Sequence, residues 1–340
     1  MTVRTALIGY GLAGRVIHRP LLLAEPGLSV THVVTADPER RAQAGSDLPG
    51  ARLLSSAEEL WSSAPEFDAV VVAAPNTVHV PLALRALDLG KATVVDKPVA
   101  LTVDDAQRLV GRAHDRGVPL SAFHNRRWDS DTLTARRLLE EGRLGEVIRL
   151  ESRFARFRPE VARRWREDAA AGGGVLLDLG THVVDQALLL LGPAVEVYAE
   201  VDVRRAGGSA EDDVFLALTH ASGARSHLWC SMAAPAALPR LVLQGSLAGW
   251  AKDGLDGQED AQRHDRALPP EPDGRLWDTG GEHAHPSEQG DWGAYYRGFV
   301  AAVTTGAPVP VDPADAERVL QVLGAARVSA RERAVVPVDA

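Results

Sequence analysis

An aspartate and a histidine stand four residues apart in an otherwise apolar stretch, GGGVLLDLGTHVVDQ; they are Asp178 and His182. Residues at positions i and i+4 share one face of a helix, and the apolar density here is typical of a buried helix. Burying polar groups costs free energy unless they are paired. The two residues are therefore a structural Asp–His pair, part of a metal site, or an acid–base pair that works on a substrate.

The metal alternative has little support in the sequence. The chain contains no HExxH motif and no paired Cys/His cluster, so we expect no metal site. Histidine, with an ordinary pKa near ~6.5, can accept a hydroxyl proton and return it at neutral pH. A structural pair and an acid–base pair that works on a substrate therefore remain the two main alternatives.

A lysine follows a run of β-branched residues in VVDKPVA, where Asp96, Lys97 and Pro98 end a predicted strand. Proline cannot donate a backbone hydrogen bond and stops the strand sharply. Ligands of open α/β sheets bind beyond the carboxyl ends of the strands. Lys97 is predicted to direct its amine into such a cleft, where a cation stabilises alkoxide charge. The alternative is a surface lysine at a strand terminus.

Residues 1–123, which must position this lysine, read as apolar strands that alternate with helices. The predicted strands include TALIG, VTHVVT, FDAVVVAAP, ATVVD and PLSAFH. They are continuous apolar runs, as expected when helices cover both faces of a parallel sheet. Residues 1–123 are therefore predicted to form an α/β, doubly wound dinucleotide-binding domain of the Rossmann type.

The remainder, residues 124–340, reads as an α+β domain for substrate binding and oligomerisation. Its long predicted helix, residues 174–192, carries Asp178 and His182. Several strands follow, separated by Gly, Ser and Asp turns, which indicates a large and mostly antiparallel sheet. Residues 255–289 are rich in Asp, Glu, Gly, Pro and His and are predicted to form a long surface loop.

A glycine pattern, G-x-G-x-x-G, lies directly after the first strand and opens the first helix, at Gly9, Gly11 and Gly14. In this context it predicts a dinucleotide site. Gly9 would make the turn, Gly11 would let the backbone approach a pyrophosphate, and Gly14 would let helix and strand pack closely. The phosphates would lie at the helix start, beside Leu12 and Ala13. The alternative is a purely structural turn.

The end of the second strand bears on the choice of cofactor. Its tip holds Thr35 rather than an acid, with Asp37 two residues on and Arg40 close by. An acid binds the ribose 2′-hydroxyl of NAD, whereas an arginine accommodates the 2′-phosphate of NADP. The pattern favours NADP. If Asp37 is the ribose acid, NAD is favoured instead, and Arg40 is then a solvated helix residue.

Other strand ends supply further candidate residues. For cofactor binding we expect contributions from Pro75, Asn76, His79, Asp96 and Lys97. For substrate binding we expect Lys97, Asn125, Arg126, Trp128, Trp165, Asp178 and His182. Trp128 stacks near the cofactor or simply packs, and Trp165 either closes over the substrate or lies in a solvated loop.

Composition excludes several classes of function. The formal net charge is −9 and no long basic run occurs, which argues against nucleic acid and against anionic membranes as partners. Cys230 is the single cysteine, so no disulfide can form within the chain, and a reducing cytoplasm is expected. The start, MTVRTALIGY, has no signal-peptide pattern, and no apolar run is long enough to span a bilayer.

The motifs together resemble one family across essentially the whole chain. The GxGxxG start is followed by APNTVH, DKP, HNRRWD and GGGVLLDLGTH. This series resembles the glucose–fructose oxidoreductase/inositol dehydrogenase family, Gfo/Idh/MocA, and is most similar to the branch with NADP-linked scyllo-inositol dehydrogenases. The family usually has Glu where this chain has Asp96. The similarity to that branch also favours NADP.

The resemblance implies an activity and roles for matching residues. The chain would move hydride between NAD(P) and a secondary hydroxyl or ketone of a cyclitol or sugar. Lys97 would hold the reacting oxygen near the nicotinamide, often beside a cis Lys–Pro bond. His182 would be the general acid/base, and Asp178 would orient the histidine or bind substrate.

The resemblance also implies assembly and leaves two rival activities. The sheet of the second domain would contact another subunit, giving a homodimer or homotetramer. Members of the same fold include NAD-dependent glycosidases, and others are cofactor-binding regulators without catalysis; both remain alternatives to the dehydrogenase.

Overall fold

The computed structural model describes residues 2–162, 167–169 and 172–338. The chain forms two compact units, each assembled from separate segments. The first unit comprises Met1–Asn125, Glu259–Ala267 and Trp292–Glu317. The second comprises Arg126–Gln258, Leu268–Asp291 and Arg318–Ala340. The division into domains of residues 1–123 and 124–340 stays a prediction.

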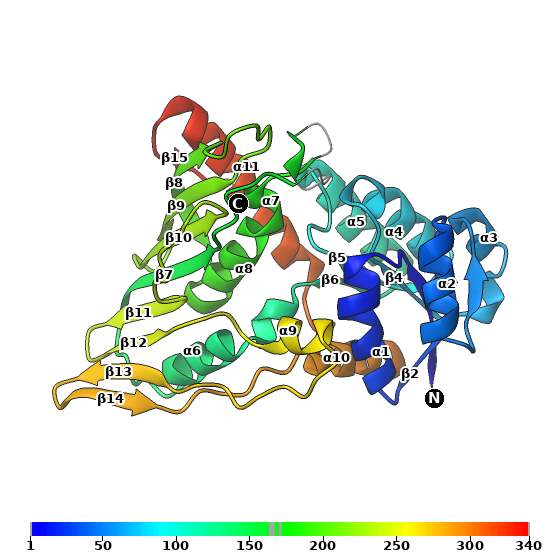
Figure 1. Cartoon of the computed structure of the whole chain (residues 1–340), viewed down its shortest axis with the longest axis horizontal. Helices are drawn as coiled ribbons and strands as arrows, with labels where there is room; N and C mark the ends of the chain where they lie inside the picture. Colours follow the sequence, from blue (N-terminus) through cyan, green and yellow to red (C-terminus); the bar gives the residue numbers. More distant parts are fainter. Residues whose placement is uncertain (1, 163–166, 170–171, 339–340) are drawn as a thin grey trace. The chain divides into compact units, whose positions relative to one another are not determined.

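The first unit is built on a six-stranded parallel sheet with strand order β3-β2-β1-β4-β5-β6, drawn from blue to cyan in Figure 1. Its strands are β1 (Val3–Ile8), β2 (Leu28–Val34), β3 (Arg52–Leu54), β4 (Ala69–Val72), β5 (Ala92–Asp96) and β6 (Leu120–Phe123). The strand sequences are apolar because helices shield both faces; all four residues of β4 are buried. The prediction of a doubly wound Rossmann sheet is confirmed.

Helices connect these strands in the order expected of parallel crossovers. They are η1 (Ala13–His18) and α1 (Arg19–Ala24), α2 (Pro38–Asp47), α3 (Ala57–Trp61), α4 (His79–Asp88) and α5 (Val103–Arg116), with the short turns η2 (Ala64–Glu66) and η3 (Asn76–Val78). Local sequence sets their ends: Thr102 caps the start of α5 and Gly117, in the left-handed region, ends it. Helices α9 (Gln258–Arg263) and α10 (Gly293–Thr305) come from later in the chain.

The second unit contains a nine-stranded sheet with strand order β14-β13-β12-β11-β7-β10-β9-β8-β15. The strands are β7 (Val147–Ala155), β8 (Ala194–Asp202), β9 (Asp213–His220), β10 (Arg225–Ser231), β11 (Leu241–Gly245), β12 (Gly249–Lys252), β13 (Gly274–Asp278), β14 (Gly281–His285) and β15 (Val336–Pro337). Every described pairing is antiparallel except that between β7 and β10. The mostly antiparallel sheet is confirmed.

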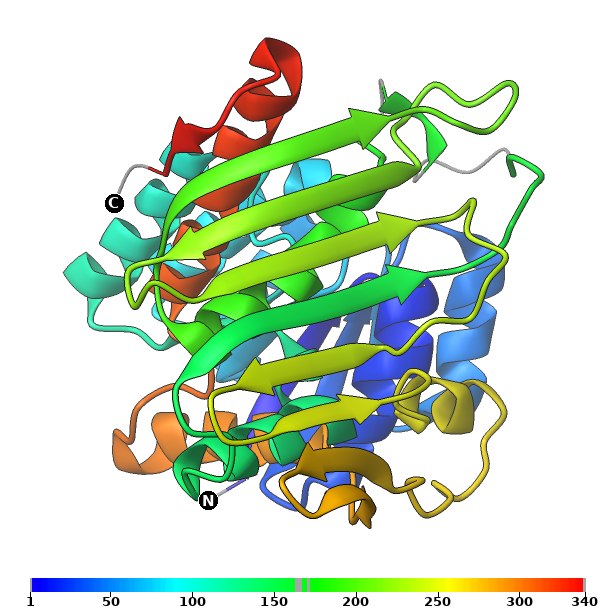
Figure 2. The same ribbon diagram turned by 90° about the vertical axis from the view of Figure 1, so that its left-hand side faces the viewer.

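Helices of the second unit pack on one face of this sheet. They are α7 (Val175–Asp178) and α8 (Gly180–Leu191), with α6 (Ser130–Glu140) beside α8 and most of α11 (Pro313–Glu332) near β8. Along β9 buried and half-buried residues alternate, because only one side of the strand faces the helices. Figure 2 shows the other face, which no helix among the described residues crosses.

Two local expectations are wrong. Residues 255–289 are not a loop throughout, since they contain α9 and the antiparallel pair β13–β14. The helix expected over residues 174–192 is interrupted at Leu179, where His182 N–H bonds to the Leu179 carbonyl, three residues back. Asp178 thus ends one helix and His182 lies in the first turn of the next. Among the described residues, no helix has both the length and the apolar character to cross a bilayer.

Candidate active site

The turn after β1 contains three glycines, and packing of the protein requires only two of them. A Cβ on Gly9, whose φ is 99°, would lie 2.3 Å from the Ala73 carbonyl oxygen, and a Cβ on Gly14 would lie 2.0 Å from the Gly9 carbonyl oxygen. Packing of the protein therefore demands both glycines. A Cβ on Gly11 would meet only Arg40 Nη1, at the ordinary distance of 3.5 Å. The contacts of the protein itself do not require a glycine at Gly11, which is compatible with the predicted close approach of a ligand there.

The residue between the first two glycines anchors this turn. Tyr10 is buried, and its hydroxyl donates to Asp47 Oδ2 over 3.0 Å, while Arg15 Nε donates to the same oxygen over 2.7 Å. Burial and the Asp47 hydrogen bond raise the pKa of Tyr10 above its ordinary value. The turn is thereby tied to the end of α2. The Gly11 carbonyl accepts the first helical bond, so the helix opens beside Leu12 and Ala13, with N–H groups available to phosphate.

The tip of β2 carries the cofactor candidates Thr35, Asp37 and Arg40. Asp37 Oδ1 caps α2 by accepting the N–H groups of Glu39 and Arg40, at 2.9 and 3.1 Å. Thr35 is buried, and its carbonyl accepts from the Arg41 guanidinium. The geometry thus gives Asp37 a structural task and leaves a half-exposed Arg40 beside Gly11. These features fit a dinucleotide with a 2′-phosphate.

The ends of β4 and β5 are joined through a buried histidine. His79 Nδ1 lies 2.9 Å from the Pro98 carbonyl oxygen, and Nε2 lies 2.8 Å from the Ala74 carbonyl oxygen. The ring is 1% exposed, so the predicted contact of His79 with a cofactor stays a prediction. The Lys97–Pro98 peptide bond is cis, as the resemblance implied. Pro75 and Asn76 begin the short turn η3 at the same edge of the sheet.

Asp96, the last residue of β5, has a low pKa of about 2, against an ordinary 3.8. Burial is the largest single influence and raises the pKa of this carboxyl, but the neighbouring His18, Lys97 and His79 side chains together lower it by more. Asp96 Oδ1 accepts the backbone N–H of Lys97 over 2.8 Å. The carboxylate therefore holds the backbone from which the Lys97 side chain departs.

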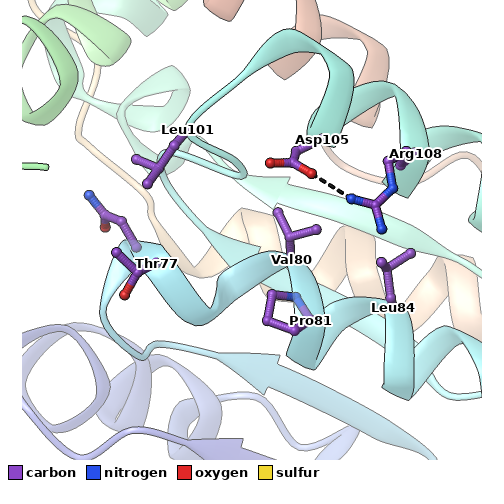
Figure 3. A pocket seen from close by; sticks show the side chains of 8 residues that line it. Thr77, Val80, Pro81, Leu84, Leu101, Asp105 and Arg108 are labelled. Carbon is purple, nitrogen blue, oxygen red and sulfur yellow. Dashed lines mark hydrogen bonds and ion pairs between the residues drawn. The ribbon is translucent and has the colours of Figure 1, made fainter.

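A cavity of about 230 Å³ lies between α4 and α5 (Figure 3). Its lining is half apolar and half polar, and the pair Arg108–Asp105, with 2.7 Å between Nη1 and Oδ1, closes one side. It shares Asn76 with the predicted cofactor residues. The lining residues are Asn76, Thr77, Val80, Pro81, Leu84, Leu101, Asp105 and Arg108.

In the second unit, His182 lies against an aromatic ring. The imidazole is 6% exposed, and its centroid is 6.2 Å from that of Phe154, with 25° between the ring planes. The Arg126 guanidinium lies over the Phe154 ring, 4.8 Å from its centroid, and pairs with Asp129 over 3.0 Å. Two predicted substrate residues, His182 and Arg126, thus both lie beside the Phe154 ring. Half-buried Asp178 lies at the end of α7, four residues before His182.

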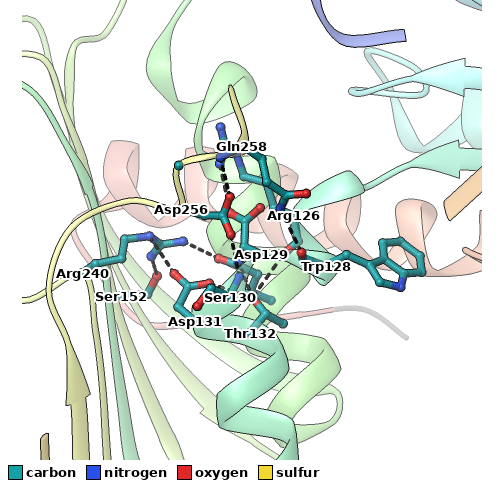
Figure 4. Close-up of polar contacts among 12 residues, drawn as sticks. Arg126, Trp128, Asp129, Ser130, Asp131, Thr132, Ser152, Arg240, Asp256 and Gln258 are labelled. Carbon is teal, nitrogen blue, oxygen red and sulfur yellow. Dashed lines mark hydrogen bonds and ion pairs between the residues drawn. The ribbon is translucent and has the colours of Figure 1, made fainter. Parts of the chain in front are cut away.

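A buried polar network supports the turn η4 (Asn125–Trp128), as Figure 4 shows. Gln186 donates to the Arg126 carbonyl over 3.1 Å, and Arg240 donates to Gln186 over 2.6 Å. Arg240 also pairs with Asp131, with 3.2 Å between Nε and Oδ2. The partners are remote in sequence, so only the fold brings them to this turn.

A second support holds the end of that turn. The Trp128 carbonyl accepts from Gln258 Nε2 over 3.1 Å and from the Asp291 N–H over 2.9 Å. Asp256 accepts the Ser130 N–H over 2.8 Å. The indole of Trp128 projects away from the polar cluster in Figure 4.

The predicted site residues are distributed over both units. The glycine turn, Thr35, Asp37, Arg40, Pro75, Asn76, His79, Asp96, Lys97 and Asn125 belong to the first, and Arg126, Trp128, Asp178 and His182 to the second. Trp165 lies outside the described residues. Phe154, Gln186 and Arg240 were not predicted. Strand alternation along β7 gives the only sequence signal for Phe154, which marks it as inward-facing and no more.

Comparisons with known proteins identify relatives over the full length. Residues 3–124 match the family model "Oxidoreductase family, NAD-binding Rossmann fold", and residues 132–250 match the "GFO/IDH/MocA C-terminal domain". The oxidoreductase YdgJ of Escherichia coli is 37% identical, over 98% of this chain and 97% of that protein. The scyllo-inositol 2-dehydrogenase (NADP(+)) IolW of Bacillus subtilis is 32% identical, over 99% of this chain and 96% of that protein.

Solved structures agree with these matches. The oxidoreductase yvaA of Bacillus subtilis superimposes with a TM-score of 0.93 at 31% identity, covering 100% of this chain and 99% of that one. An oxidoreductase from Yersinia pestis, YPO2259, superimposes with a TM-score of 0.92 at 35% identity, covering 100% of this chain and 98% of that one.

The glycine turn predicts opposite effects for two alanine substitutions. Gly11→Ala leaves the protein contacts intact, so it is expected to weaken NADPH binding about tenfold or more with little change in thermal stability. Gly14→Ala forces a Cβ into a carbonyl oxygen and is expected to destabilise the fold by about 1–3 kcal/mol. Fluorescence titration with NADPH and urea unfolding measure the two effects. Equal loss of stability in both variants contradicts the assignment.

The low pKa of Asp96 predicts that its carboxylate stabilises the folded protein and that this stabilisation is lost at low pH. Its folded pKa of about 2 is below the ordinary 3.8, so the stabilisation is complete above the higher value and disappears as the pH falls through the lower one. The difference in free energy of unfolding between the wild type and Asp96→Asn should narrow by about 1 kcal/mol between about pH 5 and about pH 3. Urea titrations at each pH measure it, and a difference that stays constant contradicts the low pKa.

Proposed function

Because the chain belongs to the GFO/IDH/MocA oxidoreductase family, it is an NAD(P)-dependent dehydrogenase or reductase, and we propose that it moves hydride to or from a secondary hydroxyl or ketone of a cyclitol or sugar. The substrate class rests on one observation above all. IolW, named as a scyllo-inositol 2-dehydrogenase, aligns with 99% of the chain. The polar and cationic groups around His182 and Arg126 are suited to hydroxyl-rich ligands.

His182 is the proposed general acid/base. A secondary alcohol that loses hydride must also lose its hydroxyl proton, and a neutral imidazole can take that proton at physiological pH. The stacked Phe154 ring keeps the imidazole in a largely water-free environment. Asp178, just before the helix break, is proposed to orient the imidazole or to bind a substrate hydroxyl.

Lys97 is the proposed cation at the reacting oxygen. An ammonium group stabilises the negative charge that develops on that oxygen as the hydroxyl proton departs. The Asp96 carboxylate and the His79 ring hold the backbone on either side of this lysine.

The nicotinamide ring, when bound, supplies or accepts the hydride. The proposed binding residues are the glycine turn with Leu12 and Ala13, then Thr35, Asp37, Arg40, Pro75, Asn76, His79 and Asp96. NADP is the proposed preference. Asp37 caps α2, and Arg40 lies beside Gly11, where a 2′-phosphate needs a cation.

We also propose that a second copy of the chain covers the open face of the nine-stranded sheet (Figure 2). This face carries a cluster of half-buried aromatic rings: the Phe215 and Trp229 centroids are 5.1 Å apart, and the Arg153 guanidinium lies 4.1 Å from the Trp229 centroid. Such clusters are common in the cores of interfaces. A cytoplasmic location is proposed, in keeping with the single, buried Cys230.

A substrate panel tests the proposed function. NADP and NAD reduction, and the reverse oxidation, are measured against inositols, hexoses and sugar derivatives; turnover is expected with at least one polyol, faster with NADP. Lys97→Ala and His182→Ala should lower kcat about 100-fold or more while cofactor binding persists. Lys91→Ala, directly before the start of β5, and His220→Ala, a buried histidine of the second unit, are the matched controls. If no polyol is turned over in either direction, the proposal of a cyclitol or sugar dehydrogenase is wrong.

Light scattering after gel filtration tests the assembly. The wild type is expected at a multiple of 36.3 kDa. Trp229→Glu buries a charge in the proposed contact and should give monomers, whereas Leu238→Glu, at an exposed loop residue, should not. A monomeric wild type, or an unchanged mass for Trp229→Glu, rules out this interface.

A further inference from the structure

The interior directly behind Lys97 contains a buried histidine that the sequence did not single out. His18, the last residue of η1, has no exposed surface, and its Nε2 lies 3.9 Å from Asp96 Oδ2. Its Nδ1 lies 2.6 Å from the hydroxyl of Tyr296, which is equally buried in α10. A tyrosine, a histidine and an aspartate thus form a line that ends at the backbone N–H of Lys97.

Aromatic packing fixes the histidine in this place. The His18 ring centroid is 4.1 Å from that of Phe123, at the end of β6. Phe123 in turn packs edge-on against Tyr295, with 4.8 Å between centroids. Neither ring nitrogen can move far from its neighbour, because the closely packed interior leaves few other rotamers.

The partners also determine which ring nitrogen carries the proton. An ionised carboxylate can only accept, so Nε2 of His18 must bear the hydrogen to interact favourably with Asp96. Nδ1 is then an acceptor, and the hydroxyl of Tyr296 can donate to it. Tyr296 selects the tautomer that directs a donor at Asp96, although the two residues are 200 positions apart in sequence.

We propose that His18, oriented by Tyr296, is a positioning residue for Lys97 and is matched to the length of Asp96. A glutamate at this position is longer by one carbon–carbon bond, about 1.5 Å. That extension would leave only about 2.4 Å of the 3.9 Å gap to His18, which is shorter than an ordinary hydrogen bond, so the longer acid either collides with the ring or releases the Lys97 N–H. The inference rests on the proposed function only for the step in which Lys97 meets the substrate.

A double-mutant cycle tests the match between the two side chains. His18→Ala and Asp96→Glu should each lower kcat about tenfold or more, with little change in KM for NADP, because the lysine is displaced rather than removed. Removal of the ring makes room for the longer acid, so the double variant His18→Ala/Asp96→Glu should recover to within about threefold of the wild type. Additive losses in the double variant overturn the proposed match.

A second measurement needs no turnover. The chain has only three lysines, Lys91, Lys97 and Lys252, so reductive methylation with ¹³C gives few NMR signals, and Lys97→Arg identifies the one from Lys97. That signal should shift in His18→Ala and in Tyr296→Phe, which removes a single oxygen atom and leaves the ring packing intact. It should return toward its original position in the double variant.

A control and the outcomes complete the test. His32→Ala also removes a buried histidine of the first unit, one that packs on Phe67, and should leave the Lys97 signal in place. A Lys97 signal that is unchanged in both His18→Ala and Tyr296→Phe overturns the inference. Because the spectra are recorded without substrate, a wild type inactive on every polyol would disprove the proposed function and leave this result standing.

Discussion

The cofactor half of this protein depends on one steric constraint, the contact between the backbones that follow β1 and β4. Gly9 and the Ala73 carbonyl are so close that no side chain fits between them, and Gly14 is as close to Gly9. This contact brings the start of the first helix against the edge of the parallel sheet. The helix N-terminus and the strand ends then face the same side, which is where dinucleotides bind in such sheets. The polar groups of the strand ends follow from this arrangement.

Two buried histidines, His79 and His18, hold the backbone around Lys97 in place. His79 links the ends of β4 and β5 through two carbonyl oxygens, and His18 lies against the acid that precedes Lys97. Both rings are excluded from water, so each polar contact is stronger than it would be at the surface. The lysine at the end of β5 therefore departs from backbone that is held on both sides.

In the second unit, a buried ion pair rather than a close backbone contact holds the predicted site residues in place. Arg240 and Asp131 are almost fully buried, and such a pair is tolerated only when further hydrogen bonds satisfy both partners. Ser152 and Gln186 accept hydrogen bonds from Arg240, and the Thr132 hydroxyl donates to Asp131. Gln186 also donates to the Arg126 carbonyl and so links this pair to the turn. The turn that carries Arg126 and Trp128 is therefore supported from within the core, while His182 stacks on Phe154 nearby.

Sequence patterns were sufficient to predict the doubly wound sheet, the mostly antiparallel sheet, the glycine turn and the position of Lys97 after a strand. Each of these follows from local patterns: apolar runs, turn residues and motif spacing act over a few positions. These patterns did not show that α7 and α8 are separate helices, because the glycine beside the break, Gly180, is also tolerated within a continuous helix. The contacts of His18 with Tyr296 and Asp96, and of Arg240 with Gln186, are visible only in the folded chain. Such contacts join residues far apart in the chain, and burial alone gives them their strength.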